Sequence, residues 1–161
     1  MKNLAWTVLF LSAVLAADGG PAPELRRDIL GLRLNMSREE AGKRLREIGS
    51  FERDERKQQE IWKLRDGSFS HLIVAFGKED GKVRFVTAVA REDAEAKRLR
   101  YSDVGKLDEA RQVGDAAIKN FNYEWTLPAG NGSPPAQVNA RGRDAEFLST
   151  YSIKRTEGAT E

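Results

Sequence analysis

The pattern of apolar positions changes its period along the chain, and the first clear period is helical. An apolar stripe with spacings of four and three residues is formed by Ala41, Leu45 and Ile48. Ser37 stands just before this stripe and Glu40 follows it at the third position, which is the spacing of a capping box. The sequence therefore predicts a helix from Ser37 to Ile48, and Gly49 is expected to end it in the left-handed conformation.

The period then changes to two. A stretch of mixed charge over 51–60 is predicted to be a solvated connector. Three segments rich in β-branched and aromatic residues follow, at 60–65, 70–77 and 82–91. They are separated by Asp66-Gly67 and Asp80-Gly81, and a glycine after an aspartate supplies the positive φ that tight hairpins need. These features predict a three-stranded antiparallel meander whose last strand, apolar on both faces, is central.

The second half of the chain shows a similar order of patterns. A helix is predicted over 106–119 from a second apolar stripe, which consists of Leu107, Ala110, Val113, Ala117 and Ile118. The segment 120–127 then alternates without a fault, with Phe121, Tyr123, Trp125 and Leu127 on one face. It is the clearest strand in the chain. Two further strands are predicted at 137–141 and 147–154.

A helix followed by three strands thus occurs twice. The sequence predicts an α+β fold in which two helix-plus-three-strand units form one antiparallel sheet, with helices packed on one face. The units span about 25–91 and 92–155 of a single domain, and 156–161 is expected to be a loose tail. Trp62 and Trp125 each come shortly after a predicted helix. A diverged internal duplication would place these two tryptophans on equivalent faces.

The first residues have a composition unlike the rest of the chain. Lys2 gives a positive start, and an almost unbroken apolar run follows from Leu4 to Leu15. This run is shorter than the roughly 20 residues that a membrane span needs. The pattern therefore favours a signal peptide over 1–16, cleaved between Ala16 and Ala17, and a flexible leader over 17–24. We expect a soluble protein, periplasmic or secreted, with no permanent membrane span.

Several short motifs stand in a distinctive order between residues 30 and 89. They are Leu34-Asn35-Met36-Ser37 before the first helix, Ile48-Gly49 at its end, Trp62 in a strand, and Val74-Ala75-Phe76 ahead of Asp80-Gly81-Lys82-Val83. This order resembles the SmpA/OmlA (BamE-like) family of bacterial envelope proteins, which implies a fold like that of β-lactamase inhibitor protein. Asn35 stands where the family has glycine and tolerates the left-handed conformation. The family's lipidated cysteine is missing, so the resemblance does not imply its membrane anchor.

Composition limits the chemistry that this chain can perform. It has no cysteine and a single histidine, His71, which removes the usual zinc and iron–sulfur sites and any histidine pair. No cofactor motif or catalytic set is present, and His71 is expected to be an ordinary residue at the start of a strand whose side chain points away from that of Ser70. Because 27 Lys and Arg residues nearly balance 25 Asp and Glu residues, the charge gives no footprint for nucleic acid.

These observations favour a non-enzymatic module that binds another protein. The aromatic row of Phe121, Tyr123 and Trp125 is expected to be core, because the other face of its strand is polar. The sheet surface left for a partner then includes Lys63, Arg65, Asn122 and Glu124. Two alternatives stand beside this hypothesis. One is a hydrolase that uses carboxylates in a cleft between the two units, and the other is a binder of an envelope glycan or small ligand through the aromatic row.

Overall fold

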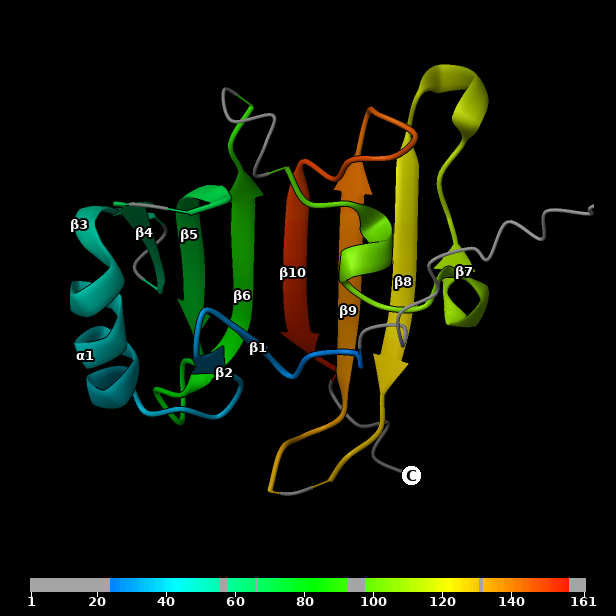
Figure 1. Cartoon of the computed structure of the whole chain (residues 1–161). Coiled ribbons are helices and arrows are strands. Elements are labelled where there is room, and N and C mark those ends of the chain that lie inside the picture. The colour runs from blue at the N-terminus through cyan, green and yellow to red at the C-terminus, as the bar shows by residue number, and fades with distance from the viewer. Residues whose placement is uncertain (1–23, 56–57, 66, 93–97, 131, 157–161) are drawn as a thin grey trace, which may run out of the picture.

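The computed structural model describes residues 24–55, 58–65, 67–92, 98–130 and 132–156, which form mostly β-structure around one α-helix (Figure 1). The helix is α1 (Arg38–Ile48), and the strands are β1 (Asp28–Ile29), β2 (Leu32–Arg33), β3 (Gly49–Glu55), β4 (Gln59–Leu64), β5 (Phe69–Phe76), β6 (Val83–Ala90), β7 (Arg111–Gln112), β8 (Phe121–Leu127), β9 (Ala136–Gly142) and β10 (Thr150–Arg155). Short 3-10 turns are η2 (Tyr101–Asp103), η3 (Leu107–Glu109) and η4 (Ala116–Ile118). The predicted signal peptide over 1–16, its cleavage point at Ala16 and Ala17, and the leader up to residue 23 lie outside the described residues.

Eight strands form one antiparallel sheet in the order β3-β4-β5-β6-β10-β9-β8-β7. The first four strands make one meander and the last four make another, and the two meet where β6 pairs with β10. At this junction Thr150 lies opposite Val89 and Lys154 lies opposite Phe85. Strands β1 and β2 form a separate hairpin. The sheet is therefore continuous from one end of the folded region to the other.

The prediction of two helix-plus-three-strand units with helices packed on one face is wrong. Residues 106–119 form η3, β7 and η4 instead of a helix. Gly114 lies so close to the next strand that an added Cβ would collide with the Asn120 backbone, and Ile118 of the expected stripe is exposed. The Asp115 side chain accepts a hydrogen bond from the Ala117 amide, and Lys119 is left-handed. Such local turn chemistry competes with the helix and here replaces it.

The first helix is confirmed, and its capping box is complete. The Ser37 hydroxyl accepts from the Glu40 amide at 3.2 Å, and the Glu40 carboxylate accepts from the Ser37 amide at 2.9 Å. The predicted left-handed conformation of Gly49 is wrong, because its φ of −157° is extended. A glycine is needed there for another reason. An added Cβ would lie 2.5 Å from the Lys63 carbonyl oxygen, so the chain can pass from helix to sheet only without a side chain.

The predicted connector over 51–60 is also wrong, because residues 51–55 belong to the edge strand β3 and Gln59 and Glu60 begin β4. A β-bulge between Phe51 and Arg53 interrupts its pairing with β4, and its side chains from Ser50 onward are all exposed. No alternation of buried and exposed residues therefore marks it as a strand. A short, highly charged edge strand discourages pairing with another sheet. The predicted strands at 60–65, 70–77, 82–91 and 120–127 are present as β4, β5, β6 and β8, and β6 lies inside the sheet as expected.

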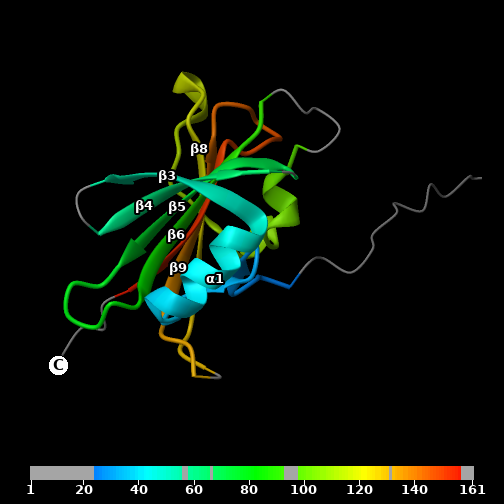
Figure 2. The same ribbon diagram turned by 90° about the vertical axis from the view of Figure 1, so that its left-hand side faces the viewer.

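The core lies between one face of the sheet and a layer made of α1, the β1–β2 hairpin and the segment around η2 (Figures 1 and 2). We call this side the covered face. Trp62 and Trp125 both point toward it and are 6% and 3% exposed. The Trp125 indole donates to the Lys106 carbonyl at 2.8 Å. The expectation that the aromatic row of β8 belongs to the core is confirmed for Trp125, and Phe121 and Tyr123 are partly buried against the same core.

Candidate functional site

The opposite side of the sheet, which we call the open face, has none of the described elements packed over it. Strand register gives three rows of side chains across it. The first row is Lys63, His71, Val89, Thr150, Arg141 and Asn122. The middle row is Ile61, Ile73, Thr87, Ser152, Asn139 and Glu124. The third row is Gln59, Ala75, Phe85, Lys154, Gln137 and Thr126.

The centre of the open face is apolar over β4, β5 and β6. Ile61 and Ala75 are buried there, and Ile73, Phe85 and Val89 are half-buried. The free face of an antiparallel sheet is normally polar, because it ends in water. The apolar surface that remains accessible comes from the half-buried Ile73, Phe85 and Val89, and apolar surface on such a face is typical of a contact surface.

Two buried polar atoms on the open face have no hydrogen-bond partner among the described residues. Thr87 is 9% exposed and Asn139 is 8% exposed, and neither Thr87 Oγ1 nor Asn139 Oδ1 is bonded. Both lie in the middle row, with Ser152 between them. An unsatisfied buried polar group costs about 1–3 kcal/mol. Both atoms are themselves buried, so a group from outside the sheet would remove this penalty only if neighbouring side chains move aside.

The four residues predicted to bind a partner do not all belong to one surface. Lys63, Asn122 and Glu124 lie on the open face, but five strand spacings of about 4.8 Å separate β4 from β8, or about 24 Å. Asn122 accepts from Arg141 Nε at 3.3 Å. Glu124, whose side chain is 10% exposed, accepts from Gln137 at 3.0 Å and pairs with Arg111. Asn122 and Glu124 are therefore already engaged by neighbouring side chains, which they hold in place.

Arg65 has a structural role instead. Its guanidinium donates to the carbonyls of Arg46 at 3.2 Å and of Glu47 and Gly49 at 3.4 Å. These carbonyls lie at the end of α1, where a helix leaves its acceptors unsatisfied and carries partial negative charge. Arg65 thus fixes the helix end to the sheet and does not lie among the binding residues.

His71 has closer polar neighbours than strand alternation predicts. A register shift between Phe69 and His71 places Ser70 in a bulge, and Ser70 Oγ lies 3.0 Å from His71 Nδ1. The expectation that the two side chains point apart is therefore wrong. Glu52 lies 3.2 Å from His71 Nε2. These are the residue types of a hydrolase triad, but the Val89 carbonyl, 3.3 Å from Ser70 Oγ, competes with the His71 imidazole for the one proton of the Ser70 hydroxyl.

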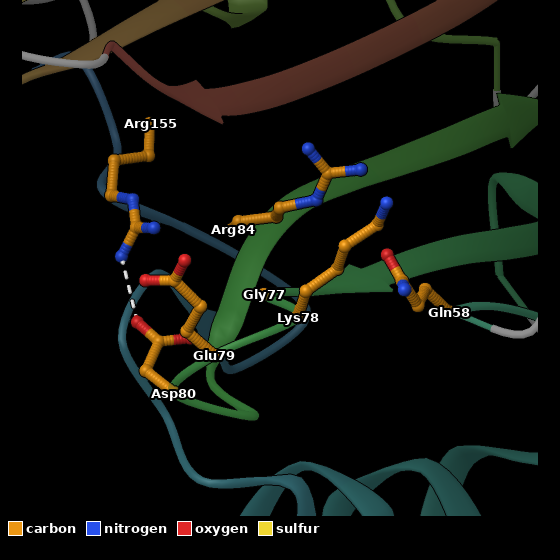
Figure 3. Close-up of a pocket in the computed structure, with 7 residues that line it drawn as sticks. All are labelled: Gln58, Gly77, Lys78, Glu79, Asp80, Arg84 and Arg155. Atoms are coloured by element: carbon orange, nitrogen blue, oxygen red, sulfur yellow. Dashed lines mark hydrogen bonds and ion pairs between the residues drawn. The ribbon is translucent and has the colours of Figure 1, made fainter.

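One end of the sheet carries a cationic rim, defined as Lys78, Arg84, Lys154 and Arg155. One cavity of about 320 Å³ is lined by Lys78, Arg84 and Gln58 among others. Figure 3 shows these side chains, with Arg155 turned toward Asp80. A second cavity of about 320 Å³ is lined by Arg84, Lys154 and Arg155 with Gln137 of the open face. Among the described residues, Lys78, Arg84 and Lys154 form no ion pair.

Two carboxylates, Glu79 and Asp80, also line the cavity of Figure 3, and Asp80 is already paired. The Lys82 amide and the Arg155 guanidinium both donate to the Asp80 carboxylate, at 3.0 and 3.1 Å, and they hold its pKa below the ordinary value. Arg155 also donates to Asn35 at 3.3 Å, and Asn35 has the left-handed φ of 67° that the sequence predicts. The rim therefore presents Lys78, Arg84 and Lys154 as the cations that remain for an external anion.

Other classes of site are not found in the part of the chain that the structure describes. No three His, Cys, Asp or Glu residues gather there in a way that would hold a metal ion. No helix there has both the length and the apolar character to cross a membrane. The candidate site is therefore a surface of side chains, composed of the open face and the cationic rim.

Comparison with known proteins gives no independent assignment of this surface. A scan against protein-family models, a search of curated proteins and a search of solved structures each found no match to the chain. The resemblance to the SmpA/OmlA family thus stays a prediction from short motifs. The geometry and the charge of the surface are therefore what indicate its ligand.

Proposed function

We propose that this protein is a non-enzymatic binding module, exported by the predicted signal peptide, that docks a folded protein on its open face. The partner presents apolar side chains to the centre of that face and carboxylates to its cationic side. The observation that carries this proposal is the pair of buried, unpartnered polar atoms, Thr87 Oγ1 and Asn139 Oδ1, beside an apolar centre on a sheet face with no described covering element. A docked surface that displaces the neighbouring side chains would satisfy both atoms, and it would also cover the half-buried Ile73, Phe85 and Val89.

The charge of the open face selects an acidic partner. Across its three rows the cations are Lys63, Arg141 and Lys154, whereas the single carboxylate, Glu124, already pairs with Arg111. The cationic rim continues this charge at one end of the sheet. Complementary charge speeds association and excludes partners of the same sign. The interaction should therefore weaken as salt is raised.

The dimensions of the face favour a protein over a glycan or a small ligand. The rows extend over six strands, or about 24 Å, which is the scale of a protein interface of about 800 Å² per partner. A glycan site needs exposed aromatic rings, but the aromatic row of β8 faces the core and Phe85 is half-buried on the open face. The broad surface is therefore better suited to another folded surface.

A photo-crosslinker placed at a surface position tests the proposal directly. In cells of the native source, a benzophenone amino acid at position 85 should crosslink one protein that mass spectrometry identifies. The same amino acid at Lys43, an exposed position on α1, is the matched control and should not crosslink it. Crosslinking of that protein from position 43 but not from position 85 would contradict the proposed face.

Binding of the purified partner then measures the contribution of each part of the surface. By titration calorimetry, Phe85→Glu should raise the Kd at least tenfold, because it places a charge in the apolar centre. Arg141→Glu combined with Lys154→Glu should also raise the Kd and should abolish its salt dependence. Lys43→Glu reverses one charge on the covered side and should leave the Kd within twofold. Equal effects of all three changes would exclude a defined docking face.

A further inference from the structure

A separate pocket lies on the covered side of the sheet, where residues of β1, the η2 segment, β5 and β10 line it. Its volume is about 160 Å³, and Phe69 and Val104 contribute apolar walls. A closed cavity of about 150 Å³ lined by Leu, Ile and Phe side chains accommodates a benzene ring. The pocket is thus large enough for a compound with a single six-membered ring.

One side of the pocket is formed by Tyr151 of β10. Tyr151 is 6% exposed, and its hydroxyl has no hydrogen-bond partner among the described residues. Burial and the nearby Asp28 carboxylate both raise the pKa of this phenol, so it stays neutral at physiological pH. A buried tyrosine hydroxyl normally has a partner, because an unpaired one costs free energy. Its position in the wall of a pocket points to a partner that enters that pocket.

The charges around the pocket favour a cation. Asp28 and Asp103 line it together with one basic residue, Arg26. The Asp28 carboxylate accepts from the Gly31 amide at 3.0 Å, and the Asp103 carboxylate accepts from the Arg100 amide at 2.8 Å. Each bond uses one oxygen and holds the carboxylate in place, which leaves the other oxygen for a ligand. Two carboxylates against one guanidinium give the pocket a net negative charge.

We propose that this pocket binds a small organic ammonium ion, with a monocyclic or short branched apolar body and a primary amine head. The apolar body lies against Phe69 and Val104. The ammonium group donates to the Asp28 and Asp103 carboxylates and, after a small shift of the phenol ring, to the Tyr151 oxygen, which is buried when the pocket is empty. This site is distinct from the open face, and it requires no protein partner.

Three probes of the same size separate the effects of shape and charge. Benzylamine, benzyl alcohol and benzoate are titrated into the full chain, and binding is followed by calorimetry and by the amide chemical shifts of residues around the pocket. Benzylamine should bind most tightly, benzyl alcohol about tenfold more weakly, and benzoate should not bind. Absence of benzylamine binding up to about 10 mM, or equal binding of benzoate, would overturn the proposal.

Two variants test the named contacts. Tyr151→Phe should weaken benzylamine about fivefold while the unliganded protein keeps or gains thermal stability, because an unpaired hydroxyl is removed. Asp28→Asn should weaken benzylamine about tenfold and leave benzyl alcohol within twofold. Benzylamine affinities unchanged by both substitutions would show that the amine binds elsewhere, and would overturn the assignment.

Matched controls separate this pocket from the rest of the core and from the open face. Tyr101 is also buried, but its hydroxyl donates to the Asp144 carbonyl at 3.1 Å. Tyr101→Phe should therefore lower thermal stability without changing benzylamine affinity. Phe85→Glu on the open face should leave benzylamine binding intact, so the two proposals can fail independently. A loss of benzylamine binding in either control would contradict the assignment to this pocket.

Discussion

The two meanders of the sheet have the same strand order but different covering layers. Counted from the outer edge to the middle, β3 to β6 and β7 to β10 are arranged alike, and each has a buried tryptophan in its second strand. The first meander is covered by α1, and the second by the segment that contains η2 and η3. One sheet can thus be covered by a regular helix at one end and by irregular turns at the other.

The two layers form through bonds of different range, although Arg65 also fixes the end of α1 to the sheet from 16 to 19 residues away. The capping box of α1 joins residues three positions apart, Ser37 and Glu40. The second layer depends on contacts that are distant in sequence, namely the bond from Trp125 to the Lys106 carbonyl and the bond from Tyr101 to the Asp144 carbonyl. A helix that is held by bonds between nearby residues can be predicted from the sequence. Distant bonds hold turns whose positions depend on the rest of the fold.

The largest expected effect comes from removing the tryptophan of each meander. Trp125→Ala should cost about 4–5 kcal/mol and Trp62→Ala about 3 kcal/mol of unfolding free energy, measured in urea. Trp62 stacks edge-on against Phe51, which is half exposed, so less packing is lost there. Trp125 also anchors Lys106 and packs against Gly105.

Hydrogen exchange shows whether the second layer depends on this distant anchor. In Trp125→Ala, the amides of Val104 and Leu148, which bond within or beside the η2 segment, should exchange faster than in Trp62→Ala at matched global stability. Equal exchange in the two variants would mean that the covering layers are held in the same way.

The fold was predictable where bonding is local and unpredictable where it is not. Two patterns depend only on residues that are close together in the sequence. They are the capping box and apolar stripe of α1, and the alternation of β5, β6 and β8. The false helix over 106–119 has a helical stripe, but its Leu107 and Ile118 are exposed because Gly114 lies against the Asn120 backbone. That close approach exists only after β8 has paired with β7 and β9.

The candidate site was partly predictable for the same reason. Strand alternation correctly places Lys63, Asn122 and Glu124 on the open face. Thr87 and Asn139 were missed, because β6, β10 and β9 bring them into one row although they are distant in sequence. The helix contact of Arg65 also depends on tertiary structure, since its acceptors lie 16 to 19 residues earlier in the chain.

A smaller loss of unfolding free energy should follow from removing one side-chain hydrogen bond in each covering layer. Ser37→Ala removes the capping box, and Tyr101→Phe leaves the Asp144 carbonyl without its donor. Each should cost about 1 kcal/mol in urea unfolding. The helix variant should lose protection from hydrogen exchange only in the first turn of α1. If Ser37→Ala instead exposes the η2 segment, the two layers are coupled more tightly than their bonds indicate.

Acid should weaken both layers through one carboxylate in each. Hydrogen bonds from Ser37 lower the pKa of Glu40 below 4.5, and the amides of Glu146 and Phe147 lower the pKa of Asp144 below 3.8. A lowered folded pKa stabilises the protein above the unfolded pKa, and this stabilisation is lost as pH falls through the folded value. Between pH 5 and 2, thermal stability should therefore fall less in Glu40→Gln and in Asp144→Asn than in the wild type. A steeper fall in either variant would reverse the expected sign.

The smallest effect concerns the turn that replaces the predicted helix. Lys119 ends η4 with a φ of 52°, a left-handed conformation that costs an L-residue about 1–2 kcal/mol and costs glycine nothing. Its side chain is exposed. Lys119→Gly should therefore stabilise the protein by about 0.5 kcal/mol after the added flexibility of the unfolded chain is included. In α1 the same change at Lys43 should instead destabilise by about 0.7 kcal/mol, because glycine is a poor helix former. Changes of opposite sign in the free energy of unfolding, measured in urea, would show that Lys119 lies in a turn. A decrease at both positions would instead support a helix over 106–119.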